Sequence, residues 1–325
     1  MKGFLRFLRF CLLSLIVVVV LAGALFAYFV YSPDPELPRL SGTLAKGSID
    51  VGGVKRTYLS YVPRGLANGA PLLLVMHGSG ENGARIRIET GYGFERLADE
   101  HGFAVVYPDS YSFDWNDCGK IGDYTVNGRE VDDVGLLVAL ADKLISEIGV
   151  DRNRVFATGV SAGGFMSLRL ALEAPSRFRA VAAVAASVPT PENFKCKPAG
   201  TGTSVMIMNG TKDPLVPFDG GEVNLLGWFY KGGNVRPALE SAQYYADVNQ
   251  LAGTPETNQT VVAGVTVEQV LWGKDSKTEV ELLAIHDGGH GLPQPYFRRP
   301  RLLGPSPMAP DGPAIIWEFF ARQRR

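Results

Sequence analysis

Net charge is almost absent from this sequence of 325 residues. Its 32 lysines and arginines are matched by 33 aspartates and glutamates, which leaves a formal net charge of −1. That balance supplies no electrostatic attraction to a nucleic acid, so no nucleic acid partner is expected. Internal repeats and long low-complexity tracts are absent too. With 46% hydrophobic residues, the chain is ordinary globular material and long enough for one large domain.

Histidine is scarce, with four residues in the chain, so few side chains can serve as a general base or a metal ligand. His286, Asp287 and His290 are close enough in sequence to suggest a metal site. Two histidines and one carboxylate without supporting ligands do not make a zinc site, however. We therefore expect no metal and no other cofactor.

Acidic residues are missing from one long stretch near the N-terminus. Lys2, Arg6 and Arg9 precede an almost uninterrupted apolar run over residues 10–31. A helix of about 22 residues is roughly 33 Å long, which is enough to cross a bilayer. The basic segment, residues 1–9, should stay in the cytoplasm, which puts the rest of the chain outside it.

The apolar run predicts a retained signal anchor, followed by a stiff linker over residues 32–46 and a globular domain over residues 47–325. Cleavage is the alternative, because Ala22-Gly23-Ala24 resembles a signal-peptidase site, although the apolar run continues beyond it. The domain would then be secreted. Under either alternative it is expected in the periplasm or outside the cell.

Only three cysteines occur, and Cys11 lies inside the apolar run. Cys118 and Cys196 are then the one pair available in an oxidising compartment. A disulfide closing so long a loop would stabilise the fold by about 4 kcal/mol. Two buried free thiols are the alternative.

Apolar segments typical of strands alternate with helical patterns along residues 47–325. The expected strands are 47–51, 55–62, 71–76, 103–107, 155–158, 178–186, 205–208, 265–272 and 280–285, and the expected helices are 89–101, 131–148, 165–172, 241–249 and 312–322. This alternation implies an α/β fold with a mostly parallel sheet flanked by helices. Such sheets gather reactive side chains beyond the carboxyl ends of their strands.

The stretch Gly159 to Gly163, sequence GVSAG, follows one of these strands and opens a helix. In that context G-x-S-x-G indicates a nucleophile elbow. Ser161 would sit on a sharp turn with its hydroxyl exposed, and a Cβ at either glycine would crowd the neighbouring strand or helix. The N–H of Ala162, at the positive end of the helix, is placed to donate to an oxyanion.

Asp213 and His290 each follow an apolar strand, as Ser161 does. A serine hydroxyl is a poor nucleophile near neutral pH and needs a histidine to take its proton. A carboxylate must then hold the imidazole in the correct tautomer. Ser161, Asp213 and His290 are therefore the predicted catalytic residues. The competing side chains are His77, His101, His286, Asp132, Asp133 and Asp287, of which Asp132 and Asp133 are expected to cap the helix over 131–148.

The turn His77-Gly78-Ser79-Gly80 follows the strand over residues 71–76. The backbone N–H of Ser79 is expected to converge with that of Ala162 and to complete an oxyanion hole. A plain glycine turn is the alternative. Trp115 lies in an aromatic loop and is a candidate wall of the substrate pocket, although a buried tryptophan fits the sequence nearly as well.

Six blocks of the sequence resemble the polyhydroxybutyrate depolymerase and feruloyl esterase group of α/β hydrolases. They are LLLVMHGSG, WNDC, VDDVGLL, GVSAGGFMSLRLA, NGTKDPLVPFDGG and HDGGHGLP. The similarity spans about residues 47–320 and implies an α/β-hydrolase catalytic domain. It also implies that the triad is Ser161, Asp213 and His290.

The same resemblance implies that Cys118 pairs with Cys196. Two departures bear on the substrate. Ser79-Gly80 stands where many depolymerases carry a cysteine and further polar residues, and Leu292-Pro293 replaces the usual aromatic residue and proline. The resemblance therefore supports ester chemistry better than it supports one named polymer.

The expected function is hydrolysis of a carboxylic ester by a serine esterase outside the cytoplasm, with the membrane as a partner through the N-terminal helix. The substrate would be a polyhydroxyalkanoate, a feruloyl or acetyl ester, or another short acyl ester, small or polymeric. A serine peptidase or amidase on the same fold is one alternative. A catalytically silent binding protein is the other.

Overall fold

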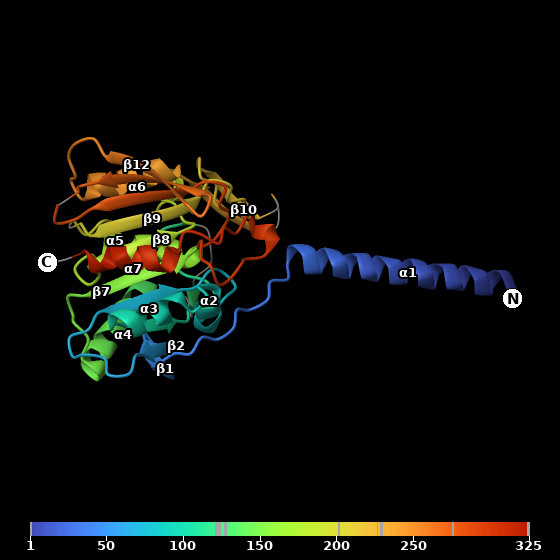
Figure 1. The fold of residues 1–325 in the computed structure, drawn as a ribbon, viewed down its shortest axis with the longest axis horizontal. Helices are drawn as coiled ribbons and strands as arrows, with labels where there is room; N and C mark the ends of the chain where they lie inside the picture. The colour runs from blue at the N-terminus through green and yellow to red at the C-terminus, as the bar shows by residue number, and fades with distance from the viewer. Residues whose placement is uncertain are drawn as a thin grey trace.

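The computed structural model describes residues 2–120, 125–126, 129–200, 202–225, 227, 230–274 and 276–323, and its domain is built on a ten-stranded sheet (Figure 1). In sheet order the strands are β1 Thr43–Val51, β2 Val54–Val62, β4 Ala104–Pro108, β3 Leu72–Met76, β7 Val155–Val160, β8 Ala180–Val184, β9 Ser204–Gly210, β14 Val280–Ile285, β13 Val265–Trp272 and β12 Glu256–Val262. Neighbours from β4 to β14 are parallel, and two antiparallel strands flank them at each edge. The prediction of a mostly parallel sheet is confirmed.

Helices cover both faces of the sheet, and each layer encloses its own apolar core. One face carries α4 Asp133–Ile148, α5 Ala162–Glu173 and α6 Ala238–Val248, and the other carries α2 Gly83–Glu89, α3 Gly93–His101 and α7 Gly312–Ala321. Strands β3, β7 and β8 are buried along their whole length between these layers. A strand covered on both faces needs apolar side chains at every position, which explains the continuous apolar runs in the sequence.

The sequence predicts one helix over residues 89–101, and this prediction is wrong. The structure has two helices there, α2 and α3, separated by a turn. Gly91 and Tyr92 in that turn have positive φ angles of 61° and 56°, which no α-helix accommodates. Asn82 begins α2 by accepting a hydrogen bond from the backbone N of Arg85 at 2.9 Å.

Short strands at the rim of the domain carry no clear apolar pattern and are absent from the prediction. They are β5 Thr125–Val126, β6 Arg129–Glu130, β10 Gly221–Leu225 and β11 Tyr230–Val235, together with β12 of the main sheet. β12 is exposed along its whole length at the sheet edge and is correspondingly polar. β10 and β11 pair as a separate antiparallel hairpin between β9 and α6.

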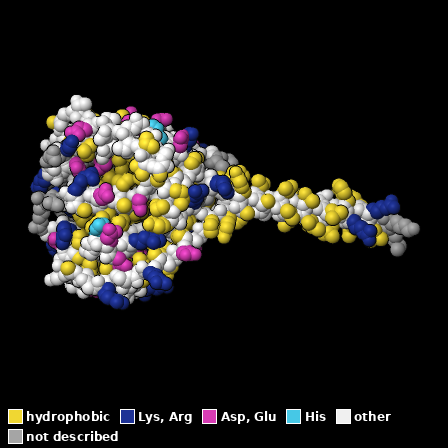
Figure 2. All heavy atoms as spheres, viewed as in Figure 1, with side chains coloured by type: hydrophobic (Ala, Val, Ile, Leu, Met, Phe, Trp, Pro, Cys, Tyr) yellow, Lys and Arg dark blue, Asp and Glu magenta, His cyan; other side chains and the backbone are white. Residues whose placement is uncertain are grey.

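Helix α1, Lys2–Phe29, extends away from the domain (Figure 1). Its stretch Gly3–Phe29 is long and apolar enough to cross a membrane and is not buried within the protein, properties that a signal sequence shares. Figure 2 shows hydrophobic side chains along the helix and basic side chains near its far end. The helix thus includes most of the basic segment that precedes the apolar run 10–31, and β1 begins inside the expected linker 32–46.

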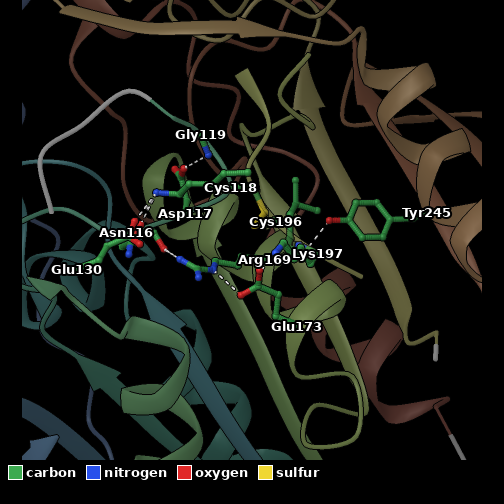
Figure 3. Close-up of a disulfide and its surroundings, with 12 residues drawn as sticks. Asn116, Asp117, Cys118, Gly119, Glu130, Arg169, Glu173, Cys196, Lys197 and Tyr245 are labelled. Atoms are coloured by element: carbon green, nitrogen blue, oxygen red, sulfur yellow. Dashed lines mark hydrogen bonds and ion pairs between the residues drawn. A yellow bond between two sulfur atoms is a disulfide. The ribbon is translucent and has the colours of Figure 1, made fainter. Parts of the chain in front are cut away.

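Cys118 and Cys196 form the predicted disulfide across 78 residues of sequence (Figure 3). It joins the loop after β4 to the loop after β8. Beside it, Arg169 of α5 pairs with Glu173 at 2.9 Å and donates to the carbonyl oxygen of Asn116 at 2.5 Å. The aromatic loop that contains Asn116 is therefore held by a covalent bond at one residue and by α5 at another.

Two adjacent aspartates at the start of α4 have different roles. Asp132 caps the helix as predicted, accepting from the backbone N of Gly135 at 2.7 Å. Asp133 does not cap it, so that expectation is wrong. Its buried carboxylate pairs with the buried guanidinium of Arg56 in β2 and accepts from the backbone N of Asn116 at 2.8 Å. Asp133 thus connects α4 to β2 and to the aromatic loop.

Asp133→Asn is expected to lower the free energy of unfolding by about 3 kcal/mol, because it leaves the charge of Arg56 buried and unpaired. Asp132→Asn is the matched control, since asparagine caps a helix as well as aspartate and the loss should stay below about 1 kcal/mol. Denaturant unfolding of both purified variants measures the difference. Equal losses in the two variants would contradict the structural role of Asp133.

Candidate active site

Ser161 lies in the tight turn between β7 and α5, with φ 57° and ψ −122°. This backbone conformation is rare for a residue with a side chain and is held by its surroundings. Ser161 N donates to the carbonyl oxygen of Val184 at 2.9 Å. A Cβ on Gly159 would overlap the backbone of Gly163, and a Cβ on Gly163 would overlap the carbonyl oxygen of Met76. The two glycines are therefore required by contact, as the elbow pattern predicts.

Asp213 and His290 meet although 77 residues separate them in the sequence. His290 Nδ1 lies 2.8 Å from Asp213 Oδ2, and the two side chains are only 2% and 0% exposed. The other carboxylate oxygen accepts from the backbone N atoms of Leu215 and Val216 at 2.8 and 2.9 Å. Because an aspartate in this position accepts a hydrogen bond from the Nδ1–H group, the imidazole keeps Nε2 free to act as a base.

The backbone of the histidine loop is also held in place. His290 N donates to the carbonyl oxygen of Leu303, and Gly289 N to that of Pro305, both at 2.7 Å. The rival carboxylate Asp287 points to solvent and pairs with Lys212 at 2.6 Å. The loop therefore presents His290 to the interior and Asp287 to the exterior.

The loop after β3 brings backbone N–H groups beside the elbow. Gly78 N donates to Glu81 Oε2 at 3.1 Å, and Gly80 N donates to the carbonyl oxygen of Phe113 at 2.8 Å. Among the described residues, the N–H of Ser79 has no such acceptor. The N–H of Ala162, the first residue of α5, has no acceptor within its helix either. Both residues line the same cavity as Ser161.

Trp115 is placed differently from the expected pocket wall. Its side chain is fully buried, its Nε1 donates to the carbonyl oxygen of His77 at 2.9 Å, and its ring lies 5.1 Å from the imidazole of His77. Burial lowers the pKa of His77, whose Nδ1 donates to the Gly78 carbonyl and whose Nε2 accepts from Ser110 N. Trp115 and His77 therefore hold the loop that carries Ser79 in place through hydrogen bonds. Both ring nitrogens of His77 are engaged, so His77 cannot serve as a base.

A cavity of about 370 Å³ contains Ser161 and His290 in its wall. Its apolar lining consists of Ala162, Phe165, Pro189, Leu215, Val223, Leu225, Val235 and Leu303. Its ionisable lining, besides His290, consists of Glu81, Asp114, Asp117 and Arg299. In the described part of the chain, no three His, Cys, Asp or Glu side chains gather so as to hold a metal ion. The cavity is therefore mainly apolar, with three carboxylates and one guanidinium in its lining.

The hairpin of β10 and β11 supplies much of this apolar wall. Val223 and Val235 pack with Val216 in a small core separate from the two cores of the sheet, and Phe165 and Leu215 pack against it. The polar and glycine-rich sequence of the hairpin gave no sign of this contribution.

Arg299 forms the centre of a charge network that the sequence did not reveal. Its guanidinium pairs with Glu89 at the end of α2 and lies 3.8 Å from Glu81. Burial raises the pKa of Glu81 to about 7, aided by the nearby charge of Glu89 and opposed by Arg299. Burial also disfavours ionised Glu89, but the charges of Arg299 and Arg85 outweigh it and lower the pKa of Glu89. Glu81 therefore titrates near neutral pH beside the Ser79 loop.

Residues 56–222 match the family described as Esterase PHB depolymerase. The chain belongs to this family. It is accordingly a carboxylic ester hydrolase, and the expected resemblance to polyhydroxybutyrate depolymerases and feruloyl esterases is confirmed.

Individual relatives of this esterase agree in chemistry and differ in substrate. The Putative esterase NocK of Nocardia uniformis subsp. tsuyamanensis is 29% identical over 286 residues, covering 84% of this chain and 81% of that protein. The Probable feruloyl esterase C of Aspergillus terreus is 28% identical, covering 86% and 87%. The Poly(3-hydroxyalkanoate) depolymerase C of Paucimonas lemoignei is 26% identical over 72% of this chain, and the match spans only 58% of its own length.

The fold is that of the α/β hydrolases. An Acetyl xylan esterase from Aspergillus awamori superposes with a TM-score of 0.55 at 21% sequence identity, covering 76% of this esterase and 94% of that structure. At this identity the likeness concerns the fold alone. The expected fold class is thereby confirmed.

Asp213→Asn is expected to lower ester turnover by roughly 10⁴-fold, the loss known for the same change in a serine protease. The amide nitrogen would face His290 Nδ1 and favour the wrong tautomer, while a side chain of nearly equal shape preserves the fold. Turnover and melting temperature of the purified variant should be measured together. Asp287→Asn, which removes an exposed carboxylate of the same loop region, is the control and should remain active. An active Asp213→Asn beside an inactive but folded Asp287→Asn would overturn the assignment.

Glu81→Gln is expected to become more stable relative to the wild type as pH rises. A folded pKa of about 7 exceeds the usual 4.5 of glutamate. The wild type therefore gains stability from the protonated form below pH 4.5 and loses it as pH rises through 7. Glutamine mimics the protonated form, so the difference between pH 5 and pH 8 should be roughly 2 kcal/mol. Unfolding curves at both pH values test this, and parallel pH profiles for the two proteins would contradict it.

Proposed function

We propose that Ser161, His290 and Asp213 form the catalytic triad of this esterase. The observation that carries the proposal is the single cavity bordered by Ser161 and His290, with Asp213 hydrogen bonded behind the imidazole. The strained backbone of Ser161 supports the same role, because it exposes a hydroxyl at the carboxyl edge of the sheet.

In the proposed mechanism, Ser161 Oγ attacks the ester carbonyl carbon while its proton passes to His290 Nε2. The carbonyl oxygen becomes an oxyanion, which accepts hydrogen bonds from the backbone N–H groups of Ser79 and Ala162. When the intermediate collapses, His290 returns the proton to the leaving alcohol. Water then attacks the acyl-enzyme by the same path, and the carboxylic acid leaves. Asp213 stabilises the imidazolium in both halves of the reaction.

The cavity lining supports a short or flexible acyl ester as substrate. Its apolar residues favour a hydrocarbon or aromatic group, as burial of apolar surface is favourable by about 25 cal/mol per Å². The carboxylates Asp114 and Asp117 line the same cavity. Burial raises the pKa of Asp117 to about 6, with help from Asp114 and against the hydrogen bond from Gly119 N. Such carboxylates would accept hydrogen bonds from hydroxyl groups and repel an anionic substrate.

We further propose that residues 10–31 span a membrane and that the catalytic domain, residues 47–325, lies outside the cytoplasm. The apolar exposed helix and the basic residues before it support this orientation. The disulfide between Cys118 and Cys196 supports it as well, because such bonds persist in oxidising compartments.

Ser161→Ala is expected to lower hydrolysis of p-nitrophenyl butyrate by more than about 10³-fold while leaving the melting temperature nearly unchanged. The reason is that the hydroxyl is the nucleophile and is not part of either core. A fluorophosphonate should label the wild type at Ser161 and should not label His290→Ala. Retention of a tenth of the wild-type turnover in Ser161→Ala would exclude it as the nucleophile. An amide analogue assayed in parallel separates an esterase from an amidase.

A further inference from the structure

The segment between α1 and β1 is attached to the domain. Its contacts are a hydrogen bond from Ser32 Oγ to the carbonyl oxygen of Arg298, an ion pair between Asp34 and Arg85 at 2.7 Å, and a hydrogen bond from Ser41 Oγ to Asp99 at 2.8 Å. Two of these contacts lie near the start of the segment and the third lies at its end. The domain therefore has a defined orientation relative to the apolar helix.

The end of α1 contacts the loop that builds the catalytic cavity. Arg301 donates to the carbonyl oxygen of Tyr28 at 3.0 Å, and its guanidinium lies 4.4 Å from the centre of the Tyr28 ring. Arg301 begins the 3₁₀ turn Arg301–Leu303, and Leu303 lines the cavity and accepts from His290 N. The residue that contacts the end of α1 and the residue that lines the cavity therefore belong to the same 3₁₀ turn.

A second crevice, of about 520 Å³, opens where α1 meets the domain, and basic residues line it. Tyr31, Arg298 and Arg301 line it, and both arginines are exposed. Figure 2 shows basic side chains where the helix meets the domain. Guanidinium groups bind phosphate oxygens in pairs, and tyrosine is enriched at the interface between membrane and water. Arg299 lines this crevice and the catalytic cavity alike, so the two are neighbours.

The direction in which α1 leaves the domain relates the cavity to the membrane. Figure 1 shows the helix leaving the domain on the side of β10, opposite to the C-terminus. Val223 and Leu225 of β10 line the catalytic cavity. A bilayer spanned by α1 would therefore lie against the edge of the domain that holds the cavity.

We propose that the cavity faces the bilayer surface and takes an amphiphilic ester whose hydrocarbon chain resides in the membrane. Arg298 and Arg301 bind lipid phosphate groups and hold the domain in this orientation. The apolar wall around Phe165, Leu215 and Leu303 receives the chain as it leaves the lipid. The inference rests on the proposed ester hydrolysis and on the proposed anchoring by α1. The reaction stays a hydrolysis, in which ester and water give acid and alcohol.

The full chain, reconstituted in vesicles of phosphatidylcholine with 30% phosphatidylglycerol, should be assayed with p-nitrophenyl palmitate in the bilayer and with soluble p-nitrophenyl butyrate. Arg298→Gln/Arg301→Gln should lower palmitate hydrolysis at least threefold and leave butyrate hydrolysis within twofold of the wild type. Arg64→Gln/Arg152→Gln removes two exposed charges from the opposite edge of the sheet and should change neither rate. Equal behaviour of the two double variants would overturn the proposal.

Orientation can be measured without catalysis. In a Cys11→Ser background, a fluorophore on Glu222→Cys beside the cavity should be quenched by lipids that carry a nitroxide headgroup. A fluorophore on Arg152→Cys, beyond the amino end of β7, should not. Equal quenching at both positions would overturn the inference and leave the proposed triad intact. Extraction of the protein from the vesicles by alkaline carbonate would overturn both the proposed anchoring and this inference. Activity in Ser161→Ala would instead overturn the proposed triad.

Discussion

A backbone contact between α5 and the end of β3 fixes the geometry of the whole site. Gly163 lies so close to the carbonyl oxygen of Met76 that no side chain fits between them. Met76 is followed directly by the loop that carries Ser79, so the contact also sets the position of that loop relative to Ser161. Main-chain atoms vary less in position than long side chains do, and a site built on them is held in place before any substrate arrives.

The central part of this arrangement could be predicted from the sequence because burial leaves a simple pattern. β3, β7 and β9 are covered on both faces, so each appears as an apolar run with a polar or glycine-rich segment after it. Parallel strands end at one edge, and Ser161, Asp213 and His290 each follow a strand that ends there. Position after a strand, the glycine-rich loop around His290 and the family resemblance together selected the Asp213–His290 pair that the structure joins by a hydrogen bond.

The parts that could not be predicted depend on pairings between distant segments. Arg299 meets Glu89 across 210 residues of sequence, and nothing near either residue marks the other as its partner. Asp133 resembled a helix cap because its neighbour is one, yet its buried guanidinium partner lies 77 residues away in β2. Trp115 shows the same limit, since an aromatic side chain fits a buried position and a pocket wall equally well. Its full burial and its hydrogen bond to the His77 carbonyl became apparent only in the structure.

The hairpin of β10 and β11 is a part of the molecule in which substitutions can be accepted independently of the main sheet. Its valines pack in a small core of their own, separate from the two large cores that the helices form with the sheet. Substitutions in the hairpin reshape the wall that meets the acyl group without removing a side chain from either large core. An enzyme with this arrangement can therefore acquire a different ester preference through its hairpin while its folding stability and its proposed catalytic groups stay unaltered.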